Sequence, residues 1–459
     1  MKTLLSVFTT FLLFVSCAQP QEAVSPSAQL ITDVTIINVR SGNEIPSQQV
    51  VIDSGKIKTI TTVIEHPESY KTIINGAGKY LIPGLAEMHA HIPPPTSSAL
   101  HTEETLFLYL SNGITTIRGM LGHAEHLRLR ERAKNGDLLS PRIYTASPSL
   151  NGNSVKTKEE AIEKVTAYQK EGFDFLKIHP GIKREVFDQV VITANEVGIP
   201  FAGHVPVDVG IRHAIESNYA AIDHVDGFIE GLVPSEANVR PEDNGFFGYN
   251  FTPLADVTKI NELVMLSRKH NIWIIPTQSL YERWFAPATA DDLLQDPEMK
   301  YMPASTLANW KARKGQYTTD NPDFNEAQWQ QFNDIRRQLI KALQDGGHGI
   351  LLGSDAPQLF NVPGFSIHHE IAGMSRAGLT PLQILQSGTI NPATFFAAED
   401  EYGTITEGLS ADLVLLNNNP LQDIKHLKNV AGVFVQGHWL SKEAIDSRLV
   451  EIAEARAKR

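Results

Sequence analysis

"LIPGLAEMHAH", residues 81–91, runs from an apolar segment through a Pro-Gly pair to two histidines separated by one alanine. Side chains at positions i and i+2 of an extended strand point to the same face, so His89 and His91 would project side by side. Such a pair is compatible with two structural histidines or with two ligands of a metal ion. A metal site would need further ligands from elsewhere in the chain.

The same stretch opens a repeating pattern of short apolar runs and amphipathic segments. Residues 158–171, 184–197 and 256–270 have the periodicity of helices. The predicted strands are the eight apolar runs 82–91, 114–119, 142–146, 173–179, 200–205, 220–225, 272–277 and 349–354. Eight strands with intervening helices predict an α/β fold, a TIM-like (β/α)8 barrel over residues 81–398.

The two ends of the chain have a different character from the middle. Residues 29–80 and 399–445 are rich in Val, Ile and Thr between turn residues, which predicts a small β-sandwich domain formed by both chain ends. A C-terminal helix is expected over 446–459. The long connection 281–325 carries several aromatic residues and is interpreted either as an active-site lid or as a packed helical insertion.

The first residues predict export. Residues 1–17 place a lysine before an apolar core and end at Cys17, the single cysteine of the sequence, so no intrachain disulfide can form. This pattern resembles a bacterial lipoprotein signal in which Cys17 is lipidated, with 18–28 as a flexible tether. We therefore expect an exported lipoprotein anchored in the cell envelope. The alternative is a periplasmic or secreted protein with a free N-terminus.

Charge narrows the class of partner. The sequence has 40 Lys and Arg against 52 Asp and Glu, a formal net charge of −12. This balance argues against nucleic acid or an anionic membrane surface as the main partner, so any membrane contact would come through the lipid anchor. A small-molecule substrate is expected, and the sequence leaves homo-oligomer formation open.

Further residues with metal-binding or catalytic chemistry stand at the ends of the predicted strands. They are Lys177, His204, His224 and Asp355. The C-terminal ends of barrel strands meet on one face, where the active sites of such barrels lie. Neutral imidazoles and a carboxylate suit Zn²⁺ and similar divalent ions. The pattern therefore predicts a metal site, with zinc as the expected ion.

Lys177 decides how many ions the site would hold. A cationic lysine would repel a metal, whereas a buried lysine with a depressed pKa can exist as the neutral amine. That amine can react with CO₂ to form a carbamate, whose two oxygens can bridge two ions about 3.5–4 Å apart. The sequence therefore predicts two divalent metal ions and a carbamate on Lys177, with a bound water that ionises near pH 7.

Taken together, the motifs identify a family resemblance. They are "PGLAEMHAH", "LKIH", "GHV", "DHVDG", "GSDA", "NPA" at 391–393 and the closing "GTITEGLSADLVLL". From about residue 29 onward the chain resembles the binuclear-metal branch of the amidohydrolase superfamily, related to imidazolonepropionase-like and Xaa-Pro dipeptidase-like hydrolases. Differences from these relatives at 118–122 and 147–153 lie around the expected pocket, so the resemblance indicates a reaction class and not a substrate.

The resemblance implies a role for each ligand. His89, His91 and Asp355 would hold the more buried ion, and His204 and His224 the more exposed one. Carboxylated Lys177 and a hydroxide would bridge the two ions. Asp355 would be the catalytic residue that accepts the proton of the attacking hydroxide and delivers it to the leaving amine.

Substrate-binding residues are suggested by position alone. Tyr281 follows the seventh strand, His179 shares a face with Lys177, and Arg118 could meet a carboxylate. A structural role is equally compatible with each of the three. The histidines of "SIHHEIAGM", within 366–374, are expected to be structural.

The sequence thus predicts a metal-dependent hydrolase that attacks an amide-type C–N bond in a dipeptide, an N-acyl amino acid or a cyclic amide. One alternative is a mononuclear deaminase of the same superfamily. That branch usually lacks the strand-four lysine and has a glutamate soon after the strand-five histidine, where this chain reads "HVPVDVG". Another alternative is a catalytically inactive surface binding protein, which the complete ligand set disfavours.

Overall fold

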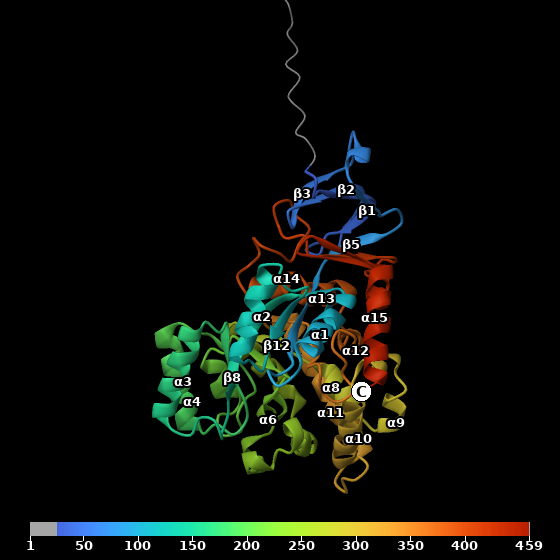
Figure 1. Cartoon of the computed structure of the whole chain (residues 1–459). Coiled ribbons are helices and arrows are strands. Elements are labelled where there is room, and N and C mark those ends of the chain that lie inside the picture. The colour runs from blue at the N-terminus through green and yellow to red at the C-terminus, as the bar shows by residue number, and fades with distance from the viewer. Residues whose placement is uncertain (1–24, 459) are drawn as a thin grey trace, which may run out of the picture.

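The computed structural model describes residues 25–458, which form two hydrogen-bonded sheets. One sheet is built from both chain ends, and most helices pack around the other, which is built from the middle of the chain (Figure 1). The predicted signal segment, the lipidation site Cys17 and residues 18–24 of the tether lie outside the described residues. Within 25–458 no helix is long and apolar enough to cross a membrane.

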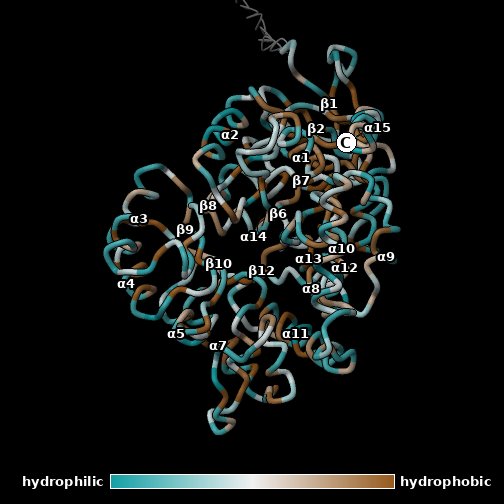
Figure 2. The backbone as a smooth tube through the Cα atoms, turned by 60° about the horizontal axis from the view of Figure 1, so that its bottom comes forward, coloured by the Kyte–Doolittle hydropathy of each residue, from teal (hydrophilic) through white to brown (hydrophobic). Residues whose placement is uncertain are grey.

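The eight predicted barrel strands form one parallel sheet in sequence order. They are β6 (Leu85–Ala90), β7 (Ile114–Gly119), β8 (Arg142–Leu150), β9 (Phe175–Ile178), β10 (Phe201–Gly203), β11 (Ala221–Asp223), β12 (Trp273–Ile275) and β13 (Gly349–Ile350). Figure 2 shows these strands in the middle of the molecule and helices such as α3, α5 and α7 outside them. Strands covered in this way are buried on both faces, which explains their continuous apolar character.

The first and last strands of this sheet are joined by backbone hydrogen bonds. The Asp355 amide donates to the His89 carbonyl at 2.9 Å, and the His91 amide donates to the Ala356 carbonyl at 2.8 Å. These bonds lie beyond β13, where the chain continues alongside β6. The two edges of the sheet therefore meet, as a (β/α)8 barrel requires.

The helices between the strands follow the predicted pattern. The predicted helices 158–171 and 184–197 are α3 (Lys158–Glu171) and α4 (Arg184–Val197), whereas 256–270 divides into a 3-10 turn and α7 (Ile260–Lys269). The Thr157 hydroxyl accepts from the Glu160 amide at the start of α3, and Gly172 ends that helix at φ 87°. The remaining helices include α1 (Ala99–Ser111), α2 (Ala124–Lys134), α5 (Ile211–Glu216), α6 (Phe228–Gly231), α11 (Glu326–Gly346), α12 (Ser366–Arg376), α13 (Pro381–Gly388) and α14 (Ile390–Phe395).

Both chain ends contribute to the other sheet. Its strands are β1 (Gln29–Ile37), β2 (Glu44–Asp53), β3 (Lys56–Thr61), β4 (Thr72–Asn75), β5 (Tyr80–Pro83), β14 (Leu413–Leu416), β15 (Val430–Val435) and β16 (His438–Ser441). The expected β-sandwich is one hydrogen-bonded sheet instead of two, because β1 pairs with β4 through its first half and with β5 through its second half. The pairing of β5 with β14 joins the two chain ends.

Two element boundaries differ from the predicted ones. The run 82–91 divides at Gly84, because β5 belongs to the end sheet and β6 to the barrel; a Cβ at Gly84 would lie 2.0 Å from Thr115 Oγ1. The C-terminal helix α15 (Lys442–Ala457) begins before residue 446, because the Ser441 hydroxyl caps it by accepting from the Ala444 amide.

The connection 281–325 is a packed helical insertion, one of its two predicted interpretations. It continues from α8 (Gln278–Arg283) into α9 (Ala290–Leu293) and α10 (Ala304–Tyr317). Trp284, Tyr301 and Trp310 are buried. Lys314 on α10 fixes the end of α8 by donating to three backbone carbonyls, those of Arg283, Trp284 and Ala286.

The histidines of α12 have polar partners in neighbouring elements. His368 is buried and its Nε2 lies 3.0 Å from the Asn112 side-chain oxygen at the end of α1. His369 Nε2 lies 2.6 Å from Glu298 Oε1 in the insertion. These contacts join α12 to its neighbours on both sides.

Burial of His368 predicts a pH dependence of stability. Burial lowers the pKa of His368 to about 3, whereas the unfolded chain has a pKa of about 6.5. Between these values the unfolded chain binds a proton that the folded protein does not, so stability falls as the pH drops below about 6.5. When the pH is lowered from 7.5 to 5.0, the free energy of unfolding of the wild type should fall by about 2 kcal/mol more than that of His368→Gln. The measurement is urea denaturation at the two pH values. An identical loss in both proteins would contradict this role.

Candidate metal centre

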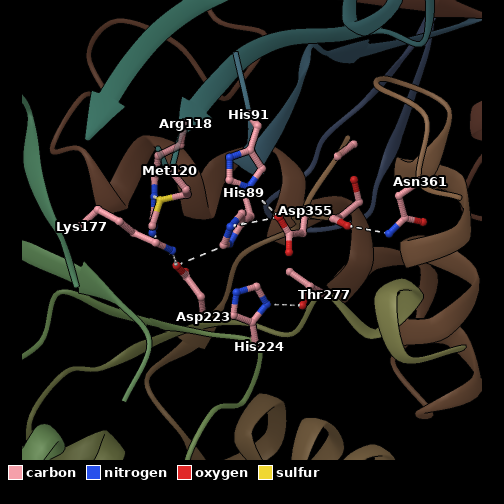
Figure 3. A network of polar contacts seen from close by, with 12 residues as sticks. His89, His91, Arg118, Met120, Lys177, Asp223, His224, Thr277, Asp355 and Asn361 are labelled. Carbon is pink, nitrogen blue, oxygen red and sulfur yellow. Dashed lines mark hydrogen bonds and ion pairs between the residues drawn. The ribbon is translucent and has the colours of Figure 1, made fainter. Parts of the chain in front are cut away.

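The structure brings the predicted ligands together where the barrel strands end, and Figure 3 shows all of them except His204. The His89 ring lies 5.4 Å from that of His91 and 4.6 Å from that of His224, centroid to centroid. The rings of His204 and His224 are also 4.6 Å apart. Residues at the ends of β6, β10 and β11 or directly beyond them, distant in the sequence, thus form one cluster.

His89, His91 and Asp355 form a group that could hold one metal ion. One ligand atom from each lies within 4.8 Å of the others. His91 Nε2 is 2.7 Å and His89 Nε2 is 3.3 Å from the same oxygen, Asp355 Oδ1. Both histidines therefore present the same nitrogen, Nε2, to one carboxylate.

His204 and His224 also keep Nε2 for another partner. His204 Nδ1 lies 3.1 Å from Asp226 Oδ2, and His224 Nδ1 lies 2.8 Å from Thr277 Oγ1. Metal-bound histidines commonly use their second nitrogen in this way, which fixes the orientation of the ring. The two side chains are thus prepared to bind an ion through Nε2.

The protonation states in the cluster suit a divalent ion. Burial lowers the pKa of His89 to about 4 and holds that of His224 well below its ordinary value, so both imidazoles are neutral at pH 7. Burial acts to raise the pKa of Asp355, but the adjacent His89 and His91 outweigh it and keep this pKa below its ordinary value. Neutral nitrogens with a carboxylate are a donor set for zinc and related ions, so these residues fit a metal.

Lys177 lies fully buried on β9 beside a carboxylate that the sequence analysis did not assign. Its Nζ is 3.3 Å from Asp223 Oδ2, and Arg118 donates to Asp223 Oδ1 at 3.1 Å. Asp223 Oδ2 also lies 3.4 Å from His89 Nδ1. Burial lowers the pKa of Lys177, which favours the neutral amine. Asp223 therefore links the buried lysine to the histidine pair.

The three residues suggested for substrate binding lie in different surroundings. Arg118 is fully buried, and the carboxylate that it meets is Asp223. Tyr281 is fully buried beneath the Arg336 guanidinium, whose carbon is 3.5 Å from the ring centroid. His179 is half-buried, and its ring lies 4.9 Å from that of His204. Of the three, His179 is the one beside the cluster and partly exposed.

The sequence analysis did not identify three residues that contact the second nitrogen of a predicted histidine ligand. We call these residues, Asp223, Asp226 and Thr277, the outer partners. Both aspartates belong to the recognised motif "DHVDG", in which only His224 was assigned. His224 has a φ of 65° and Thr277 a φ of 45°, so the alternation of an extended strand does not predict where these side chains point. The signal that could have found the aspartates is their occurrence next to a predicted ligand.

The contact between Asp226 and His204 makes a prediction about metal affinity. Asp226→Asn replaces the carboxylate that accepts from Nδ1, so the His204 ring is less well oriented. We expect zinc affinity to fall about 10–100-fold, measured by competition with a chromogenic chelator. Asp208→Asn is the matched control, because this exposed aspartate pairs with Lys183 on the surface beyond the same strand. Unchanged zinc affinity in Asp226→Asn would contradict the orienting role.

Comparisons with known proteins identify the family of the chain. Two curated adenine deaminases are similar to parts of the chain. The protein from Clostridium botulinum (strain Loch Maree / Type A3) is 28% identical over 136 residues, 29% of this chain and 21% of the relative. The protein from Rubrobacter xylanophilus is 23% identical over 403 residues, 86% of this chain and 55% of the relative. The matches thus span from about a fifth to about half of the length of these relatives.

Solved structures show the same fold over nearly the whole chain. A bottromycin amidohydrolase has a TM-score of 0.70 at 22% identity, covering 95% of this chain and 92% of that one. A Xaa-Pro dipeptidase with bound methionine has a TM-score of 0.64 at 20% identity, covering 90% and 100%. The model of the amidohydrolase family matches residues 80–440, which include every predicted ligand. The resemblance is therefore confirmed, and this chain belongs to the amidohydrolase family.

Proposed function

We propose that the protein is a metal-dependent hydrolase of small molecules that cleaves an amide-type C–N bond, in a dipeptide, an N-acyl amino acid or a cyclic amide. The observation that carries this proposal is the convergence of His89, His91, His204 and His224 with Asp355 at the ends of the barrel strands. Family membership supports the reaction class. The similar structures described as amidohydrolase and dipeptidase support an amide bond as the target.

The proposed ligand sets follow the two parts of the cluster. His89, His91 and Asp355 would hold the more buried ion, and His204 and His224 the more exposed one. When bound, such a pair of divalent ions, with zinc as the first choice, would polarise the amide carbonyl and lower the pKa of a bound water. The chain supplies the geometry through the second nitrogens of its histidines, which Asp223, Asp226 and Thr277 orient.

Lys177 is proposed to bridge the two ion positions as a carbamate. Two fully buried cations, Lys177 and Arg118, share the single carboxylate of Asp223. The Lys177 ammonium first loses one proton to give the amine. Addition of this amine to CO₂ forms an N–C bond and releases a second proton, so that a buried cation becomes an anion with two donor oxygens. This change reduces the positive charge around Asp223 and supplies oxygen ligands for a metal pair.

Asp355 is proposed to move the proton during cleavage. Its carboxylate lies among the ligand nitrogens, with Oδ1 held by His91 Nε2 at 2.7 Å. It would accept a proton from the attacking water and deliver it to the leaving nitrogen as the C–N bond breaks. One proton thus enters and leaves the same carboxylate in each turnover.

We expect the zinc-loaded protein, supplied with bicarbonate, to hydrolyse members of a panel of dipeptides, N-acyl amino acids and cyclic amides. Lys177→Ala should lower kcat at least about 100-fold, because the bridging anion is lost. A small carboxylate such as acetate, added at high concentration, should restore part of this activity. The measurement is product release followed by amine detection.

Lys183→Ala is the control for this test, since Lys183 is exposed and pairs with Asp208 on the surface. Full activity in Lys177→Ala would contradict the carbamate. Absence of turnover by the wild-type enzyme across the whole panel would contradict amide hydrolysis.

Deamination is the second candidate, favoured by the similarity to adenine deaminases. It requires the same kind of metal site but a purine substrate, and it releases ammonia. The segment that follows His204, "VPVDVG", contains no glutamate to act as the acid expected in the mononuclear deaminase branch. Ammonia release from adenine without turnover of any amide would replace the first proposal with this one.

We further propose that the protein is exported and held in the cell envelope by a lipid on Cys17, on the strength of residues 1–17. The anchor would depend on the lipid at Cys17, because the tether sequence that follows it, residues 18–28, is mostly polar. We expect the wild-type protein in the membrane fraction and Cys17→Ser in the other fractions. A Cys17→Ser protein that stays with the membranes would contradict lipidation.

A further inference from the structure

The loop between α6 and α7 carries an aromatic residue in a strained conformation. We call residues 244–250, with the sequence NGFFGYN, the Phe247 loop. Phe247 has φ 54° and ψ 45°, and its neighbour Gly248 has φ 80°. A bulky side chain rarely adopts this left-handed conformation, and it persists where surrounding contacts hold it. Strain of this kind clusters at functional sites, which suggests a functional role for Phe247.

The Phe247 ring faces the metal centre. Its centroid lies 5.7 Å from the ring of His204 and 5.4 Å from that of His224. On its other side it meets the Tyr281 ring edge-on at 5.3 Å. The ring is only half-buried. It therefore borders the two histidines assigned to the more exposed ion and remains open to a ligand.

The preceding residue, Phe246, anchors the loop to the insertion. Its ring lies 4.9 Å from that of Trp284, 5.0 Å from that of Phe285 and 5.2 Å from that of Tyr317. All three partners come from the insertion 281–325. The insertion thus has a supporting role, since it holds the loop whose next side chain reaches the metal centre.

Contacts on the other side fix the remainder of the loop. Glu230 Oε1 accepts from Asn244 Nδ2 at 2.7 Å, and a Cβ at Gly248 would lie 2.8 Å from Glu230 Oε2. The Tyr249 hydroxyl donates to the Asn325 carbonyl at 2.8 Å. The backbone at Phe247 is therefore held from both sides, and its ring is directed at the histidines.

We propose that Phe247 is a specificity-determining residue whose ring forms an apolar wall beside the bond to be cleaved. The side chains around it in the metal centre are histidines and carboxylates, so the ring adds an apolar surface to a polar site. An aromatic or large aliphatic group next to the amide would pack against this ring and lose water, which favours such substrates over small ones. The cleaved bond in this inference comes from the proposed function. The preference for large apolar groups can be tested by ligand binding alone, without hydrolysis.

The test uses hydroxamates, which bind divalent metals without being hydrolysed. Wild-type protein loaded with zinc should bind benzohydroxamate about tenfold tighter than acetohydroxamate, measured by calorimetry. In Phe247→Gly this ratio should fall to about one, while acetohydroxamate affinity changes less than about threefold. Glycine adopts the left-handed conformation without strain, so this variant retains the loop backbone. Phe396→Ala is the control, because this half-buried ring stacks on Tyr144 near the start of β8.

The results of these binding measurements distinguish a failure of the apolar wall from a failure of the proposed amide hydrolysis. A lost preference in Phe247→Gly supports the apolar wall, even if no amide of the panel is hydrolysed. An unchanged ratio in Phe247→Gly, or a wild-type protein without preference, overturns it, even if amides are hydrolysed. If neither hydroxamate binds the zinc-loaded wild type, both the metal centre and the apolar wall are wrong.

Discussion

The backbone hydrogen bonds that join the first and last barrel strands are the contacts on which the site depends. The Asp355 amide donates to the His89 carbonyl, and the His91 amide donates to the Ala356 carbonyl. They bring the carboxylate of Asp355 against His89 and His91, the second of which lies 264 positions earlier in the chain. Without closure of the barrel, these side chains would not lie close enough together to bind one metal ion.

Around this junction the chain controls charge by burial and pairing. Burial lowers the pKa of His89 and of His224 and keeps both neutral, and Asp223, Asp226 and Thr277 orient the histidine rings. Asp223 has three ionisable neighbours, because Arg118, Lys177 and His89 all contact it. A single buried carboxylate therefore connects β7, β9 and β6 beneath the proposed ions.

The sequence predicted the parts of the molecule that follow regular periodicity. The predicted helices 158–171 and 184–197 match α3 and α4, and all eight apolar runs contribute strands, because local spacing and caps determine these elements. The single end sheet depends on pairing between distant strands, which spacing does not reveal. Thr277 escaped for a different reason: its left-handed backbone, at φ 45°, departs from strand alternation. Phe247 is of the same kind, although its flanking glycines in "GFFG" are a visible signal of an unusual turn.

The two metal ions that we propose would lie among these side chains, bound through the Nε2 atoms of the histidines. Anomalous diffraction at the zinc edge, from crystals grown with zinc and bicarbonate, tests this arrangement most directly. The account predicts two peaks, one touching His89, His91 and Asp355 and the other touching His204 and His224, with density for a carbamate on Lys177 between them. A single peak, a peak bound by Asp223 in place of Asp355, or an unmodified Lys177 between two occupied positions would contradict it.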